Sequence, residues 1–477
     1  MRFFPPRIDS EPQIDDSRRM LDGIRQWALP AALTGLGTLR GLTVTSALAL
    51  IVYLPLEPAL IGGLPGAWYW VARLLPDAFV AALAFAVVIA GDRRARTLPI
   101  RLLWIVGVVA AVVVVADASR GFSVVDSINA IRVFVRYLVL GLLVWWAVDG
   151  RLGIGSIILT AVFVVGGLEI AVATFQILLR IPAVLSGSAA TAPSSFFFLT
   201  GTVGRYDRFG LAMMSVAIAI VATGQPLRRR AIGLLGVCLF LLYLSTARQA
   251  MVGLVVAGVV VALAPRMLPR NRALGAALAV LGVALVFATP RVLPAPPATD
   301  QETSARGGDL SGDASNVTVS KGQLALTTAP TQNFRLYYNL DVLPWAAATR
   351  PLLGFGPGEQ VAQHPNRVLK AKIESTGIAW DFARRFMDDS NYASLVVQFG
   401  VIVPFLFLLL LGTVTARVGW DAIRRGDTFA RFAAVFALAV LAAAWFGPAF
   451  EIRSVSVLLW VALMAALATV RSPSSIA

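Results

Sequence analysis

Arginines are the residues of this sequence whose type and spacing best suit a binding chemistry. The planar guanidinium group donates two parallel hydrogen bonds to phosphate oxygens and stays charged at neutral pH. Arg132 and Arg136 are four residues apart, so on a helix they share one face. Arg205 and Arg208 flank the start of an apolar run, and Arg248 follows a hairpin too short to be a free loop. These residues predict a site for an anionic substrate.

A wider set of arginines is expected at the same membrane surface, the outer one: Arg120, Arg132, Arg136, Arg180, Arg205, Arg208, Arg248, Arg291 and Arg453. A charge inside a span costs about 2.5–3.5 kcal/mol at its centre, so it usually has a partner. In the alternative interpretation each side chain reaches lipid headgroups, or pairs with an acid. The candidate acids are Asp77, Asp126, Asp207 and Glu451. For a single arginine both interpretations stay open.

Few acidic or imidazole groups could take part in catalysis. Asp388 and Asp389 precede Ser390-Asn391-Tyr392, where a carboxylate could deprotonate an acceptor hydroxyl or cap a helix. His364 is the only histidine, which excludes a multi-histidine metal site, and we interpret it first as a turn residue. Glu169 lies inside an apolar run and is a functional or pairing candidate. The sequence has no phosphate-binding loop motif, and we expect no metal and no cofactor.

The composition predicts a membrane protein. The chain is 58% hydrophobic and 14% charged, with a net charge of +15 and a mean hydropathy of +0.77, far from the values of soluble domains. Its basic excess indicates membrane orientation and anionic ligands rather than nucleic acid. Cys238 is the only cysteine, so no disulfide framework is expected. The first apolar run begins after about forty residues, unlike that of a cleavable signal peptide.

About twelve apolar runs are long enough for a transmembrane helix, which needs about 20 residues. We place these spans at about residues 43–62, 76–91, 102–117, 132–148, 153–178, 208–223, 231–246, 248–264, 273–289, 391–415, 428–447 and 454–470. Basic residues crowd every alternate loop, which is the cytoplasmic side by the positive-inside rule. Both termini are then cytoplasmic. The basic residues of this side include Arg93, Arg94, Arg96, Arg151, Arg228, Arg229, Arg230, Arg266, Arg270, Arg272, Arg417, Arg424 and Arg425.

The predicted fold is all-α: a polytopic membrane protein with one large periplasmic loop. Within the loop, Asn333–Tyr338 and Ile378–Phe386 are typical of short helices that fold back over the membrane domain. No internal repeat indicates a transporter built from inverted halves. The predicted parts are a cytoplasmic segment (1–42), helices one to nine (43–289), the loop (290–390), helices ten to twelve (391–470) and a cytoplasmic tail (471–477).

The sequence resembles the O-antigen polymerase and ligase family of bacterial membrane glycosyltransferases. Four segments carry the resemblance, together with the large loop after helix nine, over about residues 120 to 415. None of the segments is specific alone, and their order is what indicates the family. The segments are Phe198–Gly210 (FLTGTVGRYDRFG), Leu241–Arg248 (LLYLSTAR), Arg335 with Pro351–Gly358 (PLLGFGPG), and Asp389–Ile402 (DSNYASLVVQFGVI).

The resemblance implies a reaction and its partners. Such proteins take a glycan from an undecaprenyl-pyrophosphate carrier and join it to an acceptor glycan at the periplasmic face of the bacterial inner membrane, without a metal. Arg248 would engage the pyrophosphate, assisted by Arg291 or Arg335. Membrane lipids and a chain-length regulator protein are further expected partners, and nucleic acid is not. Further expected substrate contacts are Arg132, Arg136, Arg205, Arg208, Asn391 and Tyr392.

One departure from the family favours a polymerase. Ligases carry a histidine just before the Asn-x-Tyr-like element of the last segment, where this chain has Asp389. We therefore expect an inverting displacement in which Asp389 or Asp388 serves the acceptor hydroxyl and arginines neutralise the leaving pyrophosphate. The alternatives are a ligase acting on lipid A-core or protein, and a flippase of lipid-linked oligosaccharide. A flippase is disfavoured because charge gathers at the outer surface rather than at mid-membrane.

Overall fold

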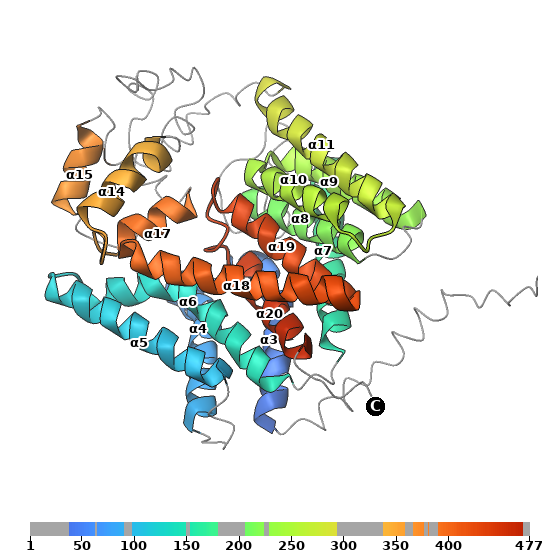
Figure 1. The fold of residues 1–477 in the computed structure, drawn as a ribbon. Helices are drawn as coiled ribbons and strands as arrows, with labels where there is room; N and C mark the ends of the chain where they lie inside the picture. The colour runs from blue at the N-terminus through green and yellow to red at the C-terminus, as the bar shows by residue number, and fades with distance from the viewer. Residues whose placement is uncertain are drawn as a thin grey trace, which may run out of the picture. The chain divides into compact units, whose positions relative to one another are not determined.

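The fold is all-helical over the described residues, which in the computed structural model are 38–62, 64–89, 98–148, 153–179, 206–223, 229–292, 337–357, 366–375, 380 and 390–470. Seven helices are long and apolar enough to cross a membrane. They are α3 (Thr38–Ile61), α4 (Gly66–Ile89), α5 (Leu98–Ser119), α6 (Val124–Ala147), α7 (Ile154–Leu179), α11 (Pro269–Val292) and α18 (Ile402–Arg425). The chain is therefore a multi-pass membrane protein (Figure 1).

Shorter helices complete the set: α8 (Tyr206–Ala222), α9 (Arg229–Ser245), α10 (Arg248–Leu263), α19 (Thr428–Ala443) and α20 (Arg453–Val470). Each predicted span except residues 391–415 falls on one helix, while the total of about twelve membrane crossings stays a prediction. Backbone contacts divide the chain into Met1–Leu42 and Thr43–Ala477. Only the start of α3 is described in the first unit, and the following account concerns the second.

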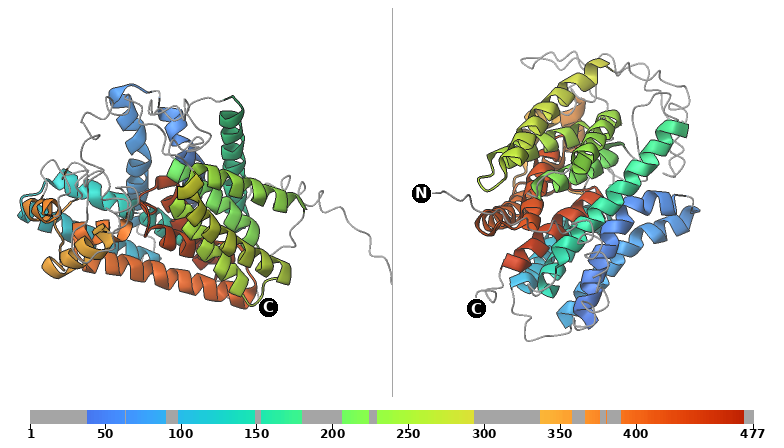
Figure 2. Two further views of the ribbon diagram at one scale, coloured as in Figure 1. Left: turned by 90° about the horizontal axis from the view of Figure 1, so that it is seen from above. Right: turned by 90° about the vertical axis from the view of Figure 1, so that its right-hand side faces the viewer.

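Helices α6, α8, α10, α19 and α20 form the packed centre of this unit. Glycines allow the close approach that membrane helices need, because lipid provides no hydrophobic force between them. A Cβ atom at Gly141 would lie 2.9 Å from the Trp460 carbonyl oxygen, and one at Gly253 would lie 2.8 Å from the Ala439 carbonyl oxygen. Helices α10 and α11 run side by side as a hairpin (Figure 2). Large exposed apolar residues lie on the outer helices: Trp68, Trp104, Phe175, Phe240 and Phe287.

The contacts between helix ends fall into two separate groups. In one group, the guanidinium of Arg266 donates to the Arg424 carbonyl and that of Arg431 contacts the Met267 sulfur. In the other group, Asp77 pairs with both Arg132 and Arg453, and Arg453 also pairs with Glu57. We call the first group, which includes Arg266, Arg424 and Arg431 and lies beside Arg425, the Arg425 end of the bundle. We call the second group the Arg453 end. In each contact both partners belong to the same predicted side of the membrane, as the alternation of basic loops requires.

The structure corrects one predicted span. Residues 391–415 are not a single helix, because the chain breaks at Gly400 between α17 (Asn391–Phe399) and α18. Gly400 has φ +73°, and a Cβ atom there would lie 2.5 Å from the Pro351 carbonyl oxygen. That carbonyl accepts a hydrogen bond from the Val401 amide at 2.6 Å. A loop segment more than forty residues earlier in the sequence thus occupies the break.

A second correction concerns α6, which was expected to begin at Arg132. It begins at Val124, after Ser123, whose hydroxyl accepts a hydrogen bond from the Asp126 amide. Arg132 and Arg136 therefore lie about two to three turns inside the helix rather than at its start. At that depth a charged side chain needs a partner within the protein.

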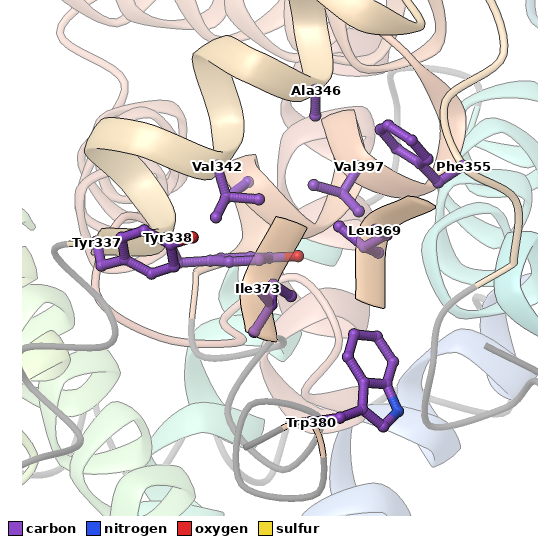
Figure 3. Packing of buried hydrophobic residues seen from close by; sticks show 10 residues of the cluster. Tyr337, Tyr338, Val342, Ala346, Phe355, Leu369, Ile373, Trp380 and Val397 are labelled. Atoms are coloured by element: carbon purple, nitrogen blue, oxygen red, sulfur yellow. The ribbon is translucent and has the colours of Figure 1, made fainter. Parts of the chain in front are cut away.

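The described part of the large loop folds onto α17. Residues Tyr338–Val342 form one wide turn (η4), followed by α14 (Leu343–Thr349), and α15 (Arg367–Glu374) lies further along. Their buried side chains form one apolar cluster with Ala393 and Val397 of α17 (Figure 3). The predicted short helices, Asn333–Tyr338 and Ile378–Phe386, lie almost entirely outside the described residues, and the helices seen here occupy other parts of the loop. The periplasmic position of the loop stays a prediction.

Candidate functional site

The turn between α19 and α20, residues 444–452, lies at the Arg453 end and contacts several other segments. We call it the hub turn. The Asn391 amide donates to the Ala444 carbonyl at 3.1 Å, and the Phe450 amide donates to the Asn391 side-chain oxygen at 2.8 Å. The Asn391 side-chain nitrogen donates to the Glu451 carboxylate, also at 2.8 Å. Asn391 is fully buried, so its side chain fixes the start of α17 on residues 444–451.

Tyr392, the next residue, is also tied to α19. Its hydroxyl donates to the Leu441 carbonyl at 2.6 Å, and its ring packs against Trp445 and Phe450. Asn391 and Tyr392 were predicted as substrate contacts. In the structure their polar groups bind the protein itself, and they position the end of the loop against the turn.

The hairpin that ends in Arg248 is strained. Helix α9 ends at Ser245 and α10 begins at Arg248, which confirms that the connection is too tight for a free loop. Between them Thr246 has φ +57°, a conformation that costs a β-branched residue about 1–3 kcal/mol. The Ser245 hydroxyl accepts a hydrogen bond from the Ala247 amide at 3.4 Å. Such strain is typical of positions that hold a functional group.

Gln249, which follows Arg248, lies directly against the hub turn. A Cβ atom at Gly447 would fall 1.2 Å from the Gln249 side-chain oxygen, so any other residue there would displace this amide. The Gln249 side-chain nitrogen is buried and has no hydrogen-bond partner within the described ranges. The Arg248 hairpin and the loop end at Asn391 therefore border the same turn.

Helix α8 packs against the hairpin at Gly210, two residues after Arg208. A Cβ atom at Gly210 would lie 2.2 Å from the Ala247 Cβ atom and 3.1 Å from the Ser245 hydroxyl. Arg208 and Arg248 therefore lie on two segments that touch, and each is partly exposed. Two of the four segments that carry the family resemblance, Phe198–Gly210 and Leu241–Arg248, meet at this contact.

The other two such segments also meet. The amides of Phe355 and Gly356 donate to the carbonyls of Val397 and Gln398, at 2.7 and 3.2 Å. Gly354 has φ +57°, and a Cβ atom there would lie 2.5 Å from the Gly400 nitrogen. The glycine-rich stretch of the loop thus packs backbone against backbone on the end of α17.

Arg120, in the turn after α5, holds this glycine-rich stretch in place. Its guanidinium donates to the carbonyls of Leu353 and Gly354, at 3.0 and 3.2 Å, and lies 3.5 Å from the Asp117 carboxylate. Burial lowers the pKa of the Arg120 guanidinium, nearby Asp117 raises it, and Arg350 lowers it further. Arg120 was expected at the outer surface with no assigned role, and its bonds are structural.

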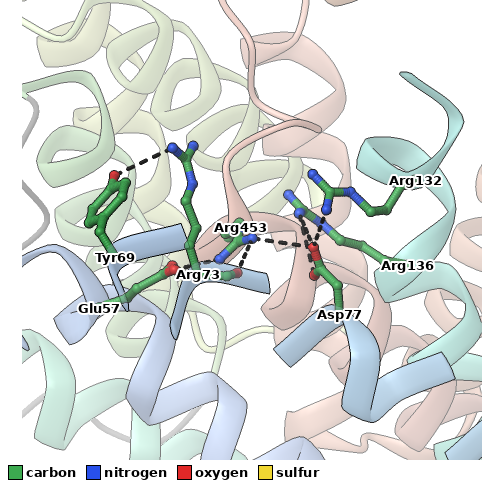
Figure 4. A network of polar contacts seen from close by, with 7 residues as sticks. All are labelled: Glu57, Tyr69, Arg73, Asp77, Arg132, Arg136 and Arg453. Atoms are coloured by element: carbon green, nitrogen blue, oxygen red, sulfur yellow. Dashed lines mark hydrogen bonds and ion pairs between the residues drawn. The ribbon is translucent and has the colours of Figure 1, made fainter. Parts of the chain in front are cut away.

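Arg132 and Arg136 join a cluster that the sequence did not predict as a unit (Figure 4). One oxygen of Asp77 lies 3.3 Å from Arg132, 3.2 Å from Arg136 and 3.3 Å from Arg453. Arg453 also bonds the Glu57 carboxylate and the Arg73 carbonyl. We call Glu57, Arg73, Asp77, Arg132, Arg136 and Arg453 the Asp77 cluster. Four helices contribute to it: α3, α4, α6 and α20.

The pairing of Arg132 and Arg136 with Asp77 is the alternative that the sequence left open for them. Glu57 and Arg73 were missed, although an acid inside the first apolar run is the kind of residue that needs a partner. The sequence analysis also did not identify Gln249 and Gly447 as site residues. The one available signal was that Gln249 directly follows Arg248. Glu451, one of the candidate acids, accepts a hydrogen bond from Asn391.

Several predicted site residues lie outside the described residues: Arg205, Arg335, Asp388 and Asp389, together with Arg180 and His364. Arg291 falls at the end of α11. Ser390 is the N-cap residue of α17. Its hydroxyl donates a hydrogen bond to the Asn339 side-chain oxygen at 2.6 Å. Asp389 directly precedes it in the sequence.

Comparison with known proteins assigns no family. No protein-family model matches the chain, and no curated protein matches it. The likeness to O-antigen polymerases and ligases therefore depends on the four quoted segments and on the contacts between them.

Proposed function

We propose that this protein is a membrane glycosyltransferase that polymerises a bacterial surface glycan at the periplasmic face of the inner membrane. The donor is a glycan on undecaprenyl pyrophosphate, and the acceptor is a second lipid-linked glycan. The observation that carries the proposal is the arrangement around residues 444–452. In the described residues, Gly210 of the first segment touches the Arg248 hairpin, and Gln249 after that hairpin borders the turn. The glycine-rich stretch packs on α17, which Asn391 binds to the same turn.

The proposed step is a displacement at the anomeric carbon of the donor sugar. The acceptor hydroxyl oxygen forms the new bond to that carbon, the bond to the pyrophosphate oxygen breaks, and the hydroxyl proton passes to Asp389 or Asp388. Arg248, with Arg208 on the neighbouring segment, would neutralise the charge that develops on the departing pyrophosphate. Hydrogen-bond donors that are already in position before the reaction usually make the largest single contribution to stabilising the transition state.

Gln249 supports the position of this pyrophosphate site. Its buried amide nitrogen has a hydrogen to donate and no acceptor among the described residues, and its backbone directly follows Arg248. A buried donor of this kind costs about 1–3 kcal/mol when unpaired. A phosphate oxygen beside the hairpin would satisfy it.

The deciding experiment is the glycan profile of a strain that lacks the protein, complemented with wild type or with Arg248→Ala. Loss of long chains, with single repeat units left on the lipid carrier or on core, supports the polymerase. Long chains that stay on undecaprenyl pyrophosphate would instead identify a ligase. Absence of lipid-linked repeats from the outer face would identify a flippase.

Arg417→Ala is the matched control, because Arg417 is an arginine of the Arg425 end. Its side chain is 61% exposed and pairs only with Asp421 among the described contacts, at 3.1 Å. Removing such an exposed pair costs at most about 1 kcal/mol. The control strain should make normal chains at normal expression, and the same profile from Arg248→Ala would overturn the assignment of Arg248.

A further inference from the structure

Three arginines of the Arg425 end carry charge that no described carboxylate neutralises. Arg266 lies in the turn between α10 and α11, Arg272 near the start of α11, and Arg424 in the last turn of α18. All three are exposed. Among the described residues their side chains contact backbone carbonyls and an aromatic ring rather than an acid. Exposed positive charge of this kind attracts an anion from the surroundings.

The nearest described carboxylates in the sequence are already engaged. Asp421 pairs with Arg417 at 3.1 Å. An Asp427 oxygen accepts hydrogen bonds from the Phe429 and Ala430 amides, at 2.8 and 3.1 Å, and so caps α19. The charge of the three arginines is therefore available to a ligand.

Each of the three guanidinium groups is held by one contact that leaves other donors available. Arg266 donates to the Arg424 carbonyl, and Nε of Arg272 donates to the Ala262 carbonyl at 2.9 Å. The Arg424 guanidinium carbon lies 4.7 Å from the Trp420 ring centroid. A guanidinium has five N–H donors, so most of them can still bind a phosphate. Because these side chains are already positioned, they lose less conformational freedom when a ligand binds.

Large apolar side chains lie exposed beside these arginines. Leu263 is 72% exposed, Leu268 44% and Trp420 52%, and each is within four residues of Arg266 or Arg424 in the sequence. Tryptophan is enriched where membrane helices reach the lipid headgroups, because its ring is largely apolar and carries one polar group. A phospholipid presents a phosphate and hydrocarbon chains together, so it matches this surface better than an acidic segment of a soluble protein does.

We propose that the Arg425 end binds the headgroup of an anionic phospholipid. Arg266, Arg272 and Arg424 donate to its phosphate, and its acyl chains cover the exposed apolar side chains beside them. The lipid would join the α10–α11 turn to the end of α18, two segments more than 150 residues apart in the sequence. Arg248 lies at the opposite end of α10, so this site is separate from the proposed pyrophosphate site and does not depend on it.

The test is native mass spectrometry of the full chain in detergent, with phosphatidylglycerol as the probe and zwitterionic phosphatidylethanolamine as the reference lipid. The wild type should bind phosphatidylglycerol more tightly. Arg272→Gln and Arg424→Gln should each weaken its binding about fivefold, which is the contribution of one basic side chain near an anionic lipid surface. Arg417→Gln is the matched control, because it removes the same charge from α18 but Arg417 pairs with Asp421. It should change the affinity by less than about twofold.

Three outcomes would overturn the site. Equal affinity of the wild type for the two lipids would show that the headgroup charge is not recognised. An equal loss in Arg417→Gln and the two site variants would show attraction by net charge alone. Unchanged binding in both site variants would exclude the lipid and leave the arginines to an acidic protein partner.

The design tolerates a variant that does not fold. The described contact of the Arg424 side chain is with the Trp420 ring, so Arg424→Gln removes no described hydrogen bond and tests the site without Arg272→Gln. Every outcome leaves the assignment of Arg248 intact, because the glycan profile tests that assignment separately.

Discussion

Asn391 and Glu451 are sixty residues apart and share a hydrogen bond of 2.8 Å between the Asn391 side-chain nitrogen and the Glu451 carboxylate. The Asn391 oxygen accepts from the Phe450 amide. One side chain therefore joins the end of the large loop to the turn between α19 and α20. The Arg248 hairpin packs on the same turn through Gly447, so the geometry of the proposed site depends on it.

Asn391→Asp should destabilise the protein by about 1–3 kcal/mol, because it replaces the donor with a carboxylate beside Glu451. The measurement is the midpoint of thermal unfolding in detergent, which should fall. The double variant Asn391→Asp with Glu451→Gln restores a donor and acceptor pair and should recover most of the loss. An unchanged midpoint for the single variant would show that this bond does not hold the turn.

Gly400→Ala should be more disruptive than Gly426→Ala. Both glycines have positive φ, +73° and +71°, but a Cβ atom at Gly426 meets nothing within 4 Å while one at Gly400 meets the Pro351 carbonyl oxygen. Gly426→Ala should therefore cost about 1–2 kcal/mol from its backbone conformation alone. Gly400→Ala should also release the loop, which limited proteolysis detects as faster cleavage within residues 337–375. Equal cleavage of the two variants would contradict this packing.

Gly447→Ala should impair glycan synthesis, because the new methyl group overlaps the Gln249 side-chain oxygen. Shortening the neighbour with Gln249→Ala makes room, so the double variant should unfold near the wild-type temperature. It should still be less active than wild type, because it lacks the Gln249 amide. Thermal unfolding and glycan yield together separate packing from function, and full activity of the double variant would exclude a role for Gln249.

Asp77→Asn should cost about 3–5 kcal/mol, because it removes the carboxylate shared by three buried or partly buried arginines. Asp421→Asn is the comparison. The Asp421 side chain is similarly buried, at 8% exposure, but its partner Arg417 is 61% exposed. We therefore expect a change of at most about 1 kcal/mol for Asp421→Asn. The measurement is thermal unfolding of both variants in the same detergent. Equal losses of stability would mean that the Asp77 cluster contributes no more to stability than the Arg417–Asp421 pair.

The two groups of helix ends should lie on opposite sides of the membrane. Cys238 is buried and is the only cysteine, so a Cys238→Ala background allows single cysteines to be labelled. Ser119→Cys, next to the Arg120 turn, should react with an impermeant maleimide in intact spheroplasts. Thr428→Cys, at the Arg425 end, should react only after permeabilisation. The reverse pattern would invert the orientation and remove the proposed site from the periplasmic face.

Local sequence determined the helices and the tight hairpin before Arg248. Apolar runs of span length predict helices wherever the chain must satisfy its own backbone groups, and each predicted span except residues 391–415 falls on one helix. The hairpin was also predictable, because the apolar runs around Thr246 leave almost no connecting residues. Such features depend on residues within one or two turns of each other.

Only the tertiary structure decided which residues meet. The sequence predicted one continuous helix through Gly400, but Pro351 packs against that glycine and breaks it. For Arg132 the sequence left both a substrate contact and a pairing with an acid open, and the structure pairs it with Asp77. Arg453, another partner of Asp77, lies more than 300 residues further along the chain. The apolar face of a helix shows that it will be buried but not against which neighbour. Contacts between distant helix ends are therefore fixed by packing, and the proposed site consists of such contacts.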